Sequence, residues 1–373
     1  MVEWKKLEQL GKFENIGTDK KIVEGEQLVT LLNYVDVYHH KKIDSSVPQM
    51  QVTASDKKIK ECTVEKGDIF VTPSSETVDD IGHSSVIEET ISNAVYSYHI
   101  MRYRLFEQNM IISYYINYVF DTDYVKKQIL KKAQGLTRFG LSKDKFGSII
   151  IPFPSLSEQN RIVGILDTFT ASIDNLKEQI AQRRKQFEYY RDQLLDLEGK
   201  DGVEMKTLKE ACEIRRGIRV VKKQLKDNAL YPVFQNSIAP MGYYNQYNRD
   251  GNMPYIICAG SSSGSVGYCY TPFWAADDCF TIESPIVNRR YIYYALKNNN
   301  NNLFKLVRKG SMPRLPHEAI DNMVIPVPSF KEQERIVGIL DTFEASITNL
   351  EAQLELRQKQ YEYYRNKLLT FKD

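Results

Sequence analysis

The chain has 373 residues, of which 42% are hydrophobic and 26% are charged, and its formal net charge is +2 at pH 7. This composition is that of a folded globular protein of two or three domains and excludes a predominantly disordered chain. No apolar run approaches the roughly 18–20 residues of a membrane helix, and the N-terminus lacks the apolar stretch of a signal peptide, so we expect a cytoplasmic protein. Five cysteines without a Cys-x-x-Cys pair indicate free thiols rather than a metal site.

Residues 1–150 form a first variable segment with signals for both strands and helices. Gly67–Thr72 has the pattern of a turn followed by a strand, and Met110–Tyr118 is a tyrosine-rich, helix-like stretch. The segment carries 20 basic and 21 acidic residues and is therefore slightly acidic. We predict a mixed α/β fold with a twisted, mostly antiparallel sheet.

A repeated segment follows at 151–197 and recurs at 325–371, where 30 of the 47 positions are identical. Each copy begins with Pro-x-Pro-Ser-x-x-Glu, which predicts a helical capping box. In such a box the serine (Ser155 or Ser329) accepts a hydrogen bond from a first-turn amide. The glutamate (Glu158 or Glu332) reaches back to the amide of the serine.

After each cap, apolar residues recur at alternating spacings of three and four, which is the a/d pattern of a coiled coil. We therefore predict two helices, each roughly 60 Å long, that pack on each other. If they pair antiparallel, a pseudo-two-fold axis relates the two halves and each helix carries its own variable segment at its N-terminal end. One seam position is arginine in both copies, Arg183 and Arg357. These arginines either fix the register of the pair or extend out of the seam.

The polar, glycine-containing stretch 198–202 marks a boundary, and residues 201–324 form a second variable segment. Tyr255–Ala259 and Thr281–Glu283 have strand signals, and Arg290–Leu296 is again tyrosine-rich and helix-like. The sequences at the ends of the two variable segments are weakly similar, which indicates one fold with different surfaces. The second segment carries 16 basic and 11 acidic residues, an excess compatible with a polyanionic partner.

Basic residues and serine-rich turns are the candidates for contact with nucleic acid, because lysine and arginine bind phosphate and arginine also reads guanine. Taken singly, each of them is also explained as a solvated surface residue. In the first variable segment the candidates are Lys20, Lys21, Lys41, Lys42, Ser74, Ser75, Arg138 and Lys143. In the second they are Arg215, Arg216, Arg219, Lys222, Lys223, Ser261, Ser262, Ser263, Arg289, Arg290, Arg308, Lys309 and Arg314.

The sequence contains no motif of a catalytic domain. A Gly-x-x-x-x-Gly-Lys-Ser/Thr loop, an Asn-Pro-Pro-aromatic tetrapeptide and a glycine-rich cofactor loop are all absent. Glu3-Trp4-Lys5 and Glu204-Met205-Lys206 match only half of a nuclease pattern. We therefore predict that this chain is not an enzyme and has no catalytic residues.

The twice-written Ile-Pro-x-Pro-Ser-x-x-Glu-Gln-x-Arg-Ile-Val, each time followed by a long helix and preceded by a dissimilar segment, resembles the specificity subunit of type I restriction-modification systems. The resemblance implies an α+β fold with target recognition domains in 1–150 and 201–324. It also implies that two long antiparallel coiled-coil helices, in 151–200 and 325–373, separate these domains with pseudo-two-fold symmetry.

The same resemblance implies a DNA-reading function without catalysis. Each recognition domain would read one half of a split DNA site, and the helices would set the gap. Two methyltransferase subunits would supply S-adenosylmethionine and adenine methylation, this chain would hold no cofactor, and motor-nuclease subunits would cleave. The partner-docking candidates are Glu158, Gln159, Arg161, Glu332, Gln333 and Arg335, although recent duplication explains their recurrence equally well.

Two other functions also fit the sequence. The chain is compatible with a coiled-coil scaffold that carries two protein-binding modules and binds no nucleic acid. It is also compatible with a DNA-reading subunit of another arrangement, in which one partner chain joins methylation and cleavage. Because the first variable segment is slightly acidic, we hypothesise that the isolated chain binds DNA weakly and that methyltransferase subunits close around the duplex.

Overall fold

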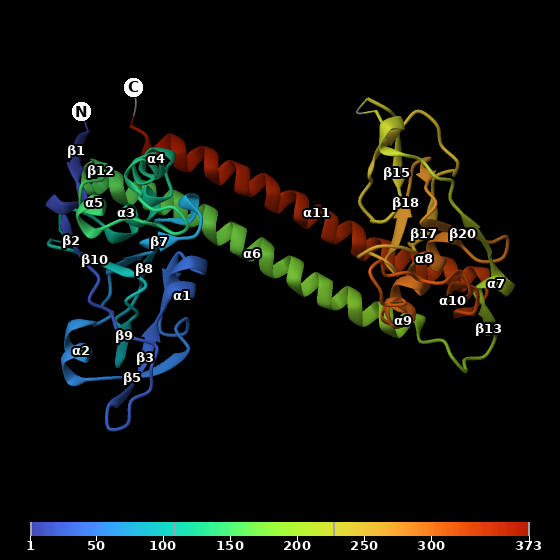
Figure 1. Ribbon diagram of the computed structural model, residues 1–373, viewed down its shortest axis with the longest axis horizontal. Helices are drawn as coiled ribbons and strands as arrows, with labels where there is room; N and C mark the ends of the chain where they lie inside the picture. The colour runs from blue at the N-terminus through green and yellow to red at the C-terminus, as the bar shows by residue number, and fades with distance from the viewer. Residues whose placement is uncertain (1, 108, 227, 372–373) are drawn as a thin grey trace. The chain divides into compact units, whose positions relative to one another are not determined.

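The computed structural model describes residues 2–107, 109–226 and 228–371 and divides into two compact units (Figure 1). Unit 1 comprises Met1–Asn175 and Gln353–Asp373, and unit 2 comprises Leu176–Ala352. Each unit therefore combines one variable segment with parts of both repeated segments.

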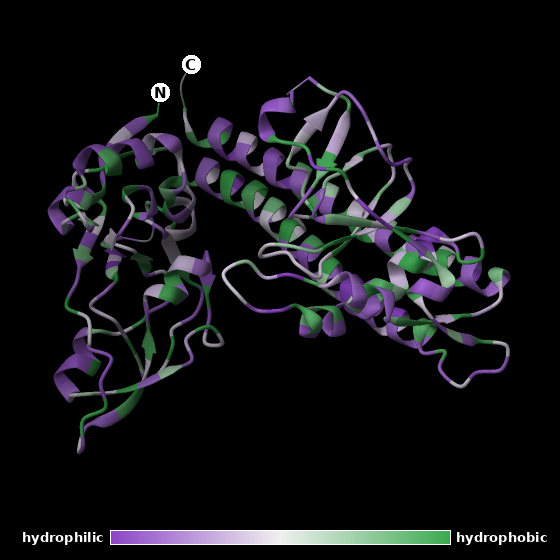
Figure 2. Ribbon diagram, turned by 45° about the vertical axis from the view of Figure 1, so that its right-hand side comes forward, coloured by the Kyte–Doolittle hydropathy of each residue, from purple (hydrophilic) through white to green (hydrophobic). Residues whose placement is uncertain are grey.

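The two repeated segments form helices of 40 residues each, α6 (Leu156–Leu195) and α11 (Phe330–Leu369). Figure 2 shows apolar residues recurring between polar ones along these helices. Leu166 and Leu340, at equivalent seam positions, are fully buried in the cores of unit 1 and unit 2. The heptad pattern thus predicts the packed face of both helices, although the seam residues Tyr190 and Tyr364 remain 44% and 41% exposed.

The predicted capping boxes are only half formed. The amide of Glu158 donates to Oγ of Ser155 at 3.3 Å, and the second copy has the same bond at 3.4 Å. The carboxylate of Glu158, however, binds Nε of Arg161 at 2.8 Å instead of the serine amide. The prediction of reciprocal caps was wrong because a guanidinium one turn along the helix is the stronger, charge-assisted partner.

In unit 1, the start of α6 packs against the end of α11. The rings of Phe169 and Tyr364 are stacked with 5.4 Å between their centroids, and the guanidinium of Arg357 lies 5.7 Å from the Phe169 centroid. A residue early in one helix therefore meets residues late in the other, so the helices pack antiparallel, as predicted.

Unit 2 repeats this arrangement with the roles of the helices exchanged. Phe343 of α11 stacks with Tyr190 of α6 at 5.3 Å, and Arg183 of α6 lies 5.8 Å from the Phe343 centroid. Each seam arginine thus packs over an aromatic ring of the opposite helix and does not extend away from it. This exchange of roles is the local signature of pseudo-two-fold symmetry.

Unit 1 contains two layers of sheet with separate hydrophobic cores. The five-stranded sheet has the order β2-β10-β6-β8-β4, and the three-stranded sheet has the order β5-β3-β9. All neighbours are antiparallel except the pairs β4–β8 and β3–β9. In Figure 1 the smaller sheet lies on the far side of the larger one from α3 and the start of α6. The strands are β2 (Gly11–Glu14), β3 (Gln27–Leu32), β4 (Lys42–Ile43), β5 (Met50–Ala54), β6 (Ile69–Val71), β8 (Ser84–Ile87), β9 (Ala94–Tyr96) and β10 (Met101–Leu105).

Helices cover these sheets, and a small strand pair borders them. The pair is β7 (Ser74–Ser75) with β11 (Phe139–Gly140). The helices are α1 (Tyr34–His39), α2 (Asp56–Glu61), α3 (Ser113–Phe120), α4 (Asp123–Lys132) and α5 (Lys143–Gly147). The larger core includes Tyr115, Phe146 and Leu166 together with Leu369 from α11.

Unit 2 has a four-stranded antiparallel sheet, β14-β20-β17-β18, and a three-stranded sheet, β16-β15-β19, in which β15 and β19 are parallel. The strands are β14 (Glu213–Arg216), β15 (Tyr231–Phe234), β16 (Gly242–Tyr244), β17 (Met253–Ile257), β18 (Val266–Cys269), β19 (Trp274–Ala275) and β20 (Cys279–Glu283). The helices are α7 (Leu208–Ala211), α8 (Arg289–Asn298), α9 (Asn300–Leu306) and α10 (His317–Asp321). The prediction of mixed, mostly antiparallel folds is confirmed in both units.

Each variable segment begins and ends side by side, just before its long helix. β1 (Glu3–Lys6) pairs antiparallel with β12 (Ile150–Phe153), and β13 (Glu204–Thr207) pairs antiparallel with β21 (Val324–Val327). This shared strand pairing explains the weak sequence similarity between the ends of the two variable segments.

None of the described helices has the length and apolar composition needed to cross a membrane. Across the same residues, His, Cys, Asp and Glu side chains form no cluster of three or more that suits a metal ion. The five cysteines are free thiols.

Candidate functional site

In each unit, one helix of the variable segment is hydrogen-bonded to the long helix. This helix is α3 in unit 1 and α8 in unit 2. Both helices carry Tyr-Ile-x-Tyr, at 115–118 and 291–294. The phenol of Tyr115 donates to the carbonyl of Pro152 at 3.2 Å, and that of Tyr291 donates to the carbonyl of Pro326 at 3.0 Å. Because both prolines precede a long helix, the first tyrosine ties each variable segment to the entrance of that helix.

The second tyrosine binds an aspartate of the long helix at the equivalent position. Tyr118 donates to Asp167 of α6, and Tyr294 donates to Asp341 of α11 at 2.6 Å. Burial, and next the hydrogen bond to the aspartate, raises the pKa of Tyr118 and of Tyr294, so both phenols remain protonated donors.

A buried glutamine completes this arrangement, which we call the domain anchor. Gln159 accepts a hydrogen bond from the amide of Ile112 at 2.9 Å and donates to the carbonyl of Pro154 at 2.9 Å. Gln333 accepts from the amide of Asn288 at 2.7 Å and donates to Pro328 at 2.9 Å. The domain anchor of unit 1 is Tyr115, Tyr118, Gln159 and Asp167, and that of unit 2 is Tyr291, Tyr294, Gln333 and Asp341.

The anchors correct two sequence predictions. Gln159 is 0% exposed and Gln333 is 1% exposed, so neither reaches a partner protein, and both recur because they hold the variable segment. The helix predicted from Met110 begins instead at Ser113, since the amide of Ile112 is bound by Gln159.

The other docking candidates remain at the surface. Arg161 and Glu158 form an exposed ion pair of 2.7 Å, and Arg335 and Glu332 form the same pair in the second copy. The guanidinium lowers the pKa of each glutamate, so both pairs stay charged at neutral pH. Their role in docking stays a prediction.

Each anchor aspartate also binds a cation from the variable segment, and the two cations come from different elements. In unit 1, Nζ of Lys42 on β4 lies 3.0 Å from Asp167. In unit 2, Nε of Arg290 on α8 lies 2.6 Å from Asp341, and its terminal nitrogen Nη2 binds Glu344. The two repeated helices thus carry an aspartate at the same position. One variable segment binds it with a lysine from a strand, and the other binds it with an arginine from a helix.

Arg290 was predicted to bind DNA, and its burial contradicts this, whereas Lys42 is paired with Asp167 but partly exposed, so its contact with DNA stays a prediction. Arg290 is buried among tyrosine rings, with the Tyr293 and Tyr268 centroids 4.6 and 4.7 Å from its guanidinium carbon. Burial alone would lower the pKa of Arg290, but the bond to Asp341 raises it, so the buried guanidinium stays charged. Lys41 is similarly engaged, since its Nζ binds Asp121 at 2.5 Å.

The remaining candidates of unit 1 lie at the surface. The strand pair β7–β11 brings Ser74 and Ser75 beside Arg138, and Nη2 of Arg138 donates to Oγ of Ser74 at 3.3 Å. Lys20 and Lys143 are exposed, while Lys21 forms an exposed ion pair with Asp19 at 2.7 Å. Their contact with DNA stays a prediction.

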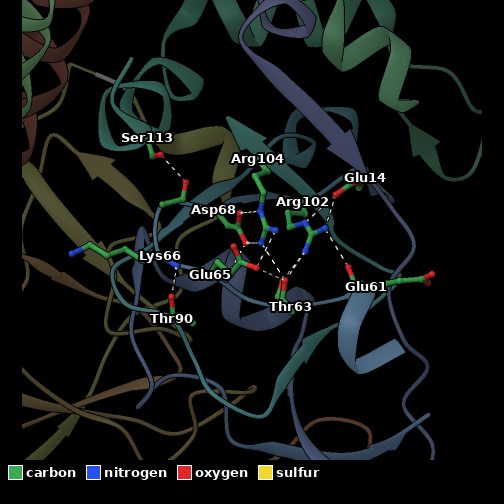
Figure 3. A network of polar contacts seen from close by, with 11 residues as sticks. Glu14, Glu61, Thr63, Glu65, Lys66, Asp68, Thr90, Arg102, Arg104 and Ser113 are labelled. Atoms are coloured by element: carbon green, nitrogen blue, oxygen red, sulfur yellow. Dashed lines mark hydrogen bonds and ion pairs between the residues drawn. The ribbon is translucent and has the colours of Figure 1, made fainter. Parts of the chain in front are cut away.

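Two arginines on β10 that the sequence did not single out form an internal network (Figure 3). The guanidinium of Arg102 binds Glu14 and donates to the carbonyl of Thr63 at 2.8 Å, and Nε of Arg104 lies 2.6 Å from Asp68. Figure 3 shows both side chains pointing into the same cluster. These arginines join strands of unit 1 and are not free for a ligand.

Three further arginines of unit 2 form partly exposed ion pairs, and Arg216 forms a hydrogen bond to the backbone. Arg215 pairs with Glu213 and Glu283 at 2.6 and 2.9 Å, and Arg289 pairs with Glu283 at 2.9 Å. Arg216 donates to the carbonyl of Asp277, and Arg314 pairs with Asp278 at 3.3 Å.

The serine loop is a tight internal turn rather than an open phosphate loop. Ser263 is 3% exposed, and its hydroxyl donates to the carbonyl of Cys258 at 2.9 Å. The amides of Ser263 and Gly264 already donate to backbone carbonyls at 3.0 and 2.8 Å. Ser263 therefore cannot contact DNA, whereas Ser261 is exposed and Ser262 is half-buried.

Six predicted cations of unit 2 make no ion pair within the described part of the chain. They are all exposed: Arg216, Arg219, Lys222, Lys223, Arg308 and Lys309. These cations lack an ion-pair partner among the described residues, and the contact of the exposed basic candidates of unit 2 with DNA stays a prediction.

Comparison with known proteins connects this geometry to a family. Residues 2–183 and 200–357 match the family model described as type I restriction modification DNA specificity domain. The chain is 31% identical over 259 residues to the EcoR124I/EcoR124II specificity subunit of Escherichia coli, a match that covers 59% of this chain and 61% of that protein. It is 30% identical over 224 residues to the EcoprrI specificity subunit of the same organism, covering 55% of each protein. The chain therefore spans about three fifths of the length of the first of these relatives.

The fold is also similar to that of a solved structure, the S subunit of a type I restriction-modification system from M. genitalium. The TM-score is 0.69 with 17% sequence identity, and the match covers 100% of this chain and 97% of that one. At this identity the likeness concerns the fold, and it extends over both units and both long helices.

Proposed function

Because this chain belongs to the type I restriction modification DNA specificity family, we propose that it selects a two-part DNA site for partner enzymes. The variable segments of the two units are the two readers, and α6 and α11 are the constant frame. The observation that carries this proposal is the domain anchor, which occurs twice with equivalent residues. Because the same anchor residues occur in both units, two variable segments with different surfaces can be held on the same pair of helices.

The partners that fit this role are two methyltransferase subunits and, in a system that also restricts DNA, motor-nuclease subunits. The exposed pairs Glu158–Arg161 and Glu332–Arg335 recur at equivalent positions and suit twin docking sites. The chemistry resides in the partners in this proposal, so S-adenosylmethionine binds the methyltransferase subunits and this chain binds no cofactor.

Mapping methylated adenines across the genome of the source organism tests the proposal. We expect a split motif with two specific halves and a fixed gap when the chain is present, and no methylation of that motif after deletion of its gene. Identical methylation in both strains would favour the scaffold alternative, in which the two modules bind proteins and no DNA.

A further inference from the structure

A polar pocket of about 430 Å³ opens in unit 2 between residues 219–222 and the loop that follows β15. Its polar lining consists of Arg219, Lys222, Gln235, Asn236 and Ser237. In Figure 1, β15 lies on the side of β17 and β18 that faces away from α8, so the pocket is remote from the domain anchor of this unit.

The pocket combines free cations with free amide groups. Neither Arg219 nor Lys222 has an ion-pair partner in the described residues, in contrast to Arg215 and Arg289. The side-chain amides of Gln235 and Asn236 likewise have no hydrogen-bond partner among these residues. A primary amide carries both a donor and an acceptor, which a site for phosphate alone does not need.

The backbone beneath these side chains is held in place. β15 pairs with β16 on one side and β19 on the other, and Val220 and Val233 are buried in a small core below the pocket. Oγ of Ser237 accepts a hydrogen bond from the amide of Ala239 at 3.1 Å, which fixes the turn of the loop. The amides are therefore presented from a supported loop at the surface.

We propose that this pocket is the base-reading site of unit 2, and this inference rests on the function proposed above. Gln235 and Asn236 bind the major-groove edge of an adenine in one half-site, because adenine presents there an acceptor, N7, beside a donor, the N6 amino group. Arg219 and Lys222 bind the flanking phosphates and position the base without specifying it.

The test compares methylated-adenine maps of strains that carry the wild-type chain or a variant. In the double variant Gln235→Ala/Asn236→Ala, we expect preference for one adenine in one half-site to fall at least tenfold, with the other half unchanged. Asn236→Asp replaces the amide by an acceptor and is expected to shift the preferred base at that position toward cytosine. Arg219→Ala is expected to lower methylation at all sites about equally while leaving the motif intact.

Asn301→Ala, an exposed asparagine on α9 of the same unit, is the matched control and leaves the motif unchanged. An unaltered thermal unfolding midpoint of each purified variant shows that its fold is intact. If the wild-type chain specifies a split motif and both amide variants leave its two halves unchanged, the pocket is not the reader. If the wild-type chain specifies no split motif, the proposed function itself is wrong.

Discussion

Nε of Arg290 lies 2.6 Å from Oδ1 of Asp341, and this ion pair joins helix α8 of a variable segment to the constant helix α11. The arginine side chain is 9% exposed and the aspartate side chain 44%, so the buried guanidinium depends on a partner at the rim of the interface. In unit 1 the equivalent Asp167 binds Lys42 from a different element. In both units the carboxylate lies on a repeated helix and the cation lies on the variable segment.

We predict that Asp341→Asn destabilises unit 2 by about 1–3 kcal/mol, because it leaves a buried guanidinium with one carboxylate partner instead of two. Urea denaturation followed by tyrosine fluorescence measures the loss. Glu355→Gln, which removes one partner of an exposed pair on the same helix, is the control and should leave the midpoint unchanged. Equal midpoints for Asp341→Asn and the wild type would show that the pair contributes nothing.

The buried glutamines predict a unit-specific effect. Gln333→Ala leaves the amide of Asn288 and the carbonyl of Pro328 without their partner, at a cost of about 1–3 kcal/mol. Hydrogen exchange of α8 should therefore accelerate about five- to hundredfold, while exchange of α3 stays the same. Gln159→Ala should do the reverse, and Gln182→Ala, at an exposed position, should change neither helix. Equal acceleration in both helices would contradict two separate anchors.

The seam arginines predict an antiparallel pattern of energetic coupling. A double-mutant cycle between Arg357→Ala and Phe169→Ala should give a coupling energy of about 0.5–1 kcal/mol, typical of a cation–π contact. The same cycle between Arg357 and Phe343 should give none, since the structure places Phe343 against Arg183. A cycle between Phe169 and Phe343, the equivalent seam positions that a parallel pair would bring together, should also give none, and coupling there would indicate parallel helices.

The small number of free cations predicts weak DNA binding by the isolated chain. Many basic residues are neutralised internally, such as Lys42, Arg215 and Arg290, so few remain to release counterions from DNA. Fluorescence anisotropy at about 0.15 M salt should show weak binding that tightens when the methyltransferase subunits are added. Tight, sequence-specific binding by the purified chain alone would overturn this prediction.

The sequence predicted the two repeated helices better than it predicted the contacts of the variable segments. The repeat, the helix starts after Ser155 and Ser329, and the buried seam follow from periodicity, which depends on near neighbours. The partners of Arg290 and Lys42 come from distant parts of the chain, so residue type alone could not show that Arg290 is buried and that Lys42 is paired. Gln159 recurs in the repeat for a reason that only its buried contacts reveal. The Tyr-Ile-x-Tyr common to both variable segments was the available signal for the anchors.

The length of the constant helices tests the account most directly. Inserting one heptad after Gln179 and one after its repeat equivalent, Gln353, keeps the a/d seam and lengthens each helix by about 10 Å, close to three base pairs of DNA. Methylated-adenine mapping of this variant should show both half-sites unchanged and the gap between them longer by about three base pairs. A variant that still directs methylation with the original gap would contradict the claim that these helices set the spacing of two DNA readers.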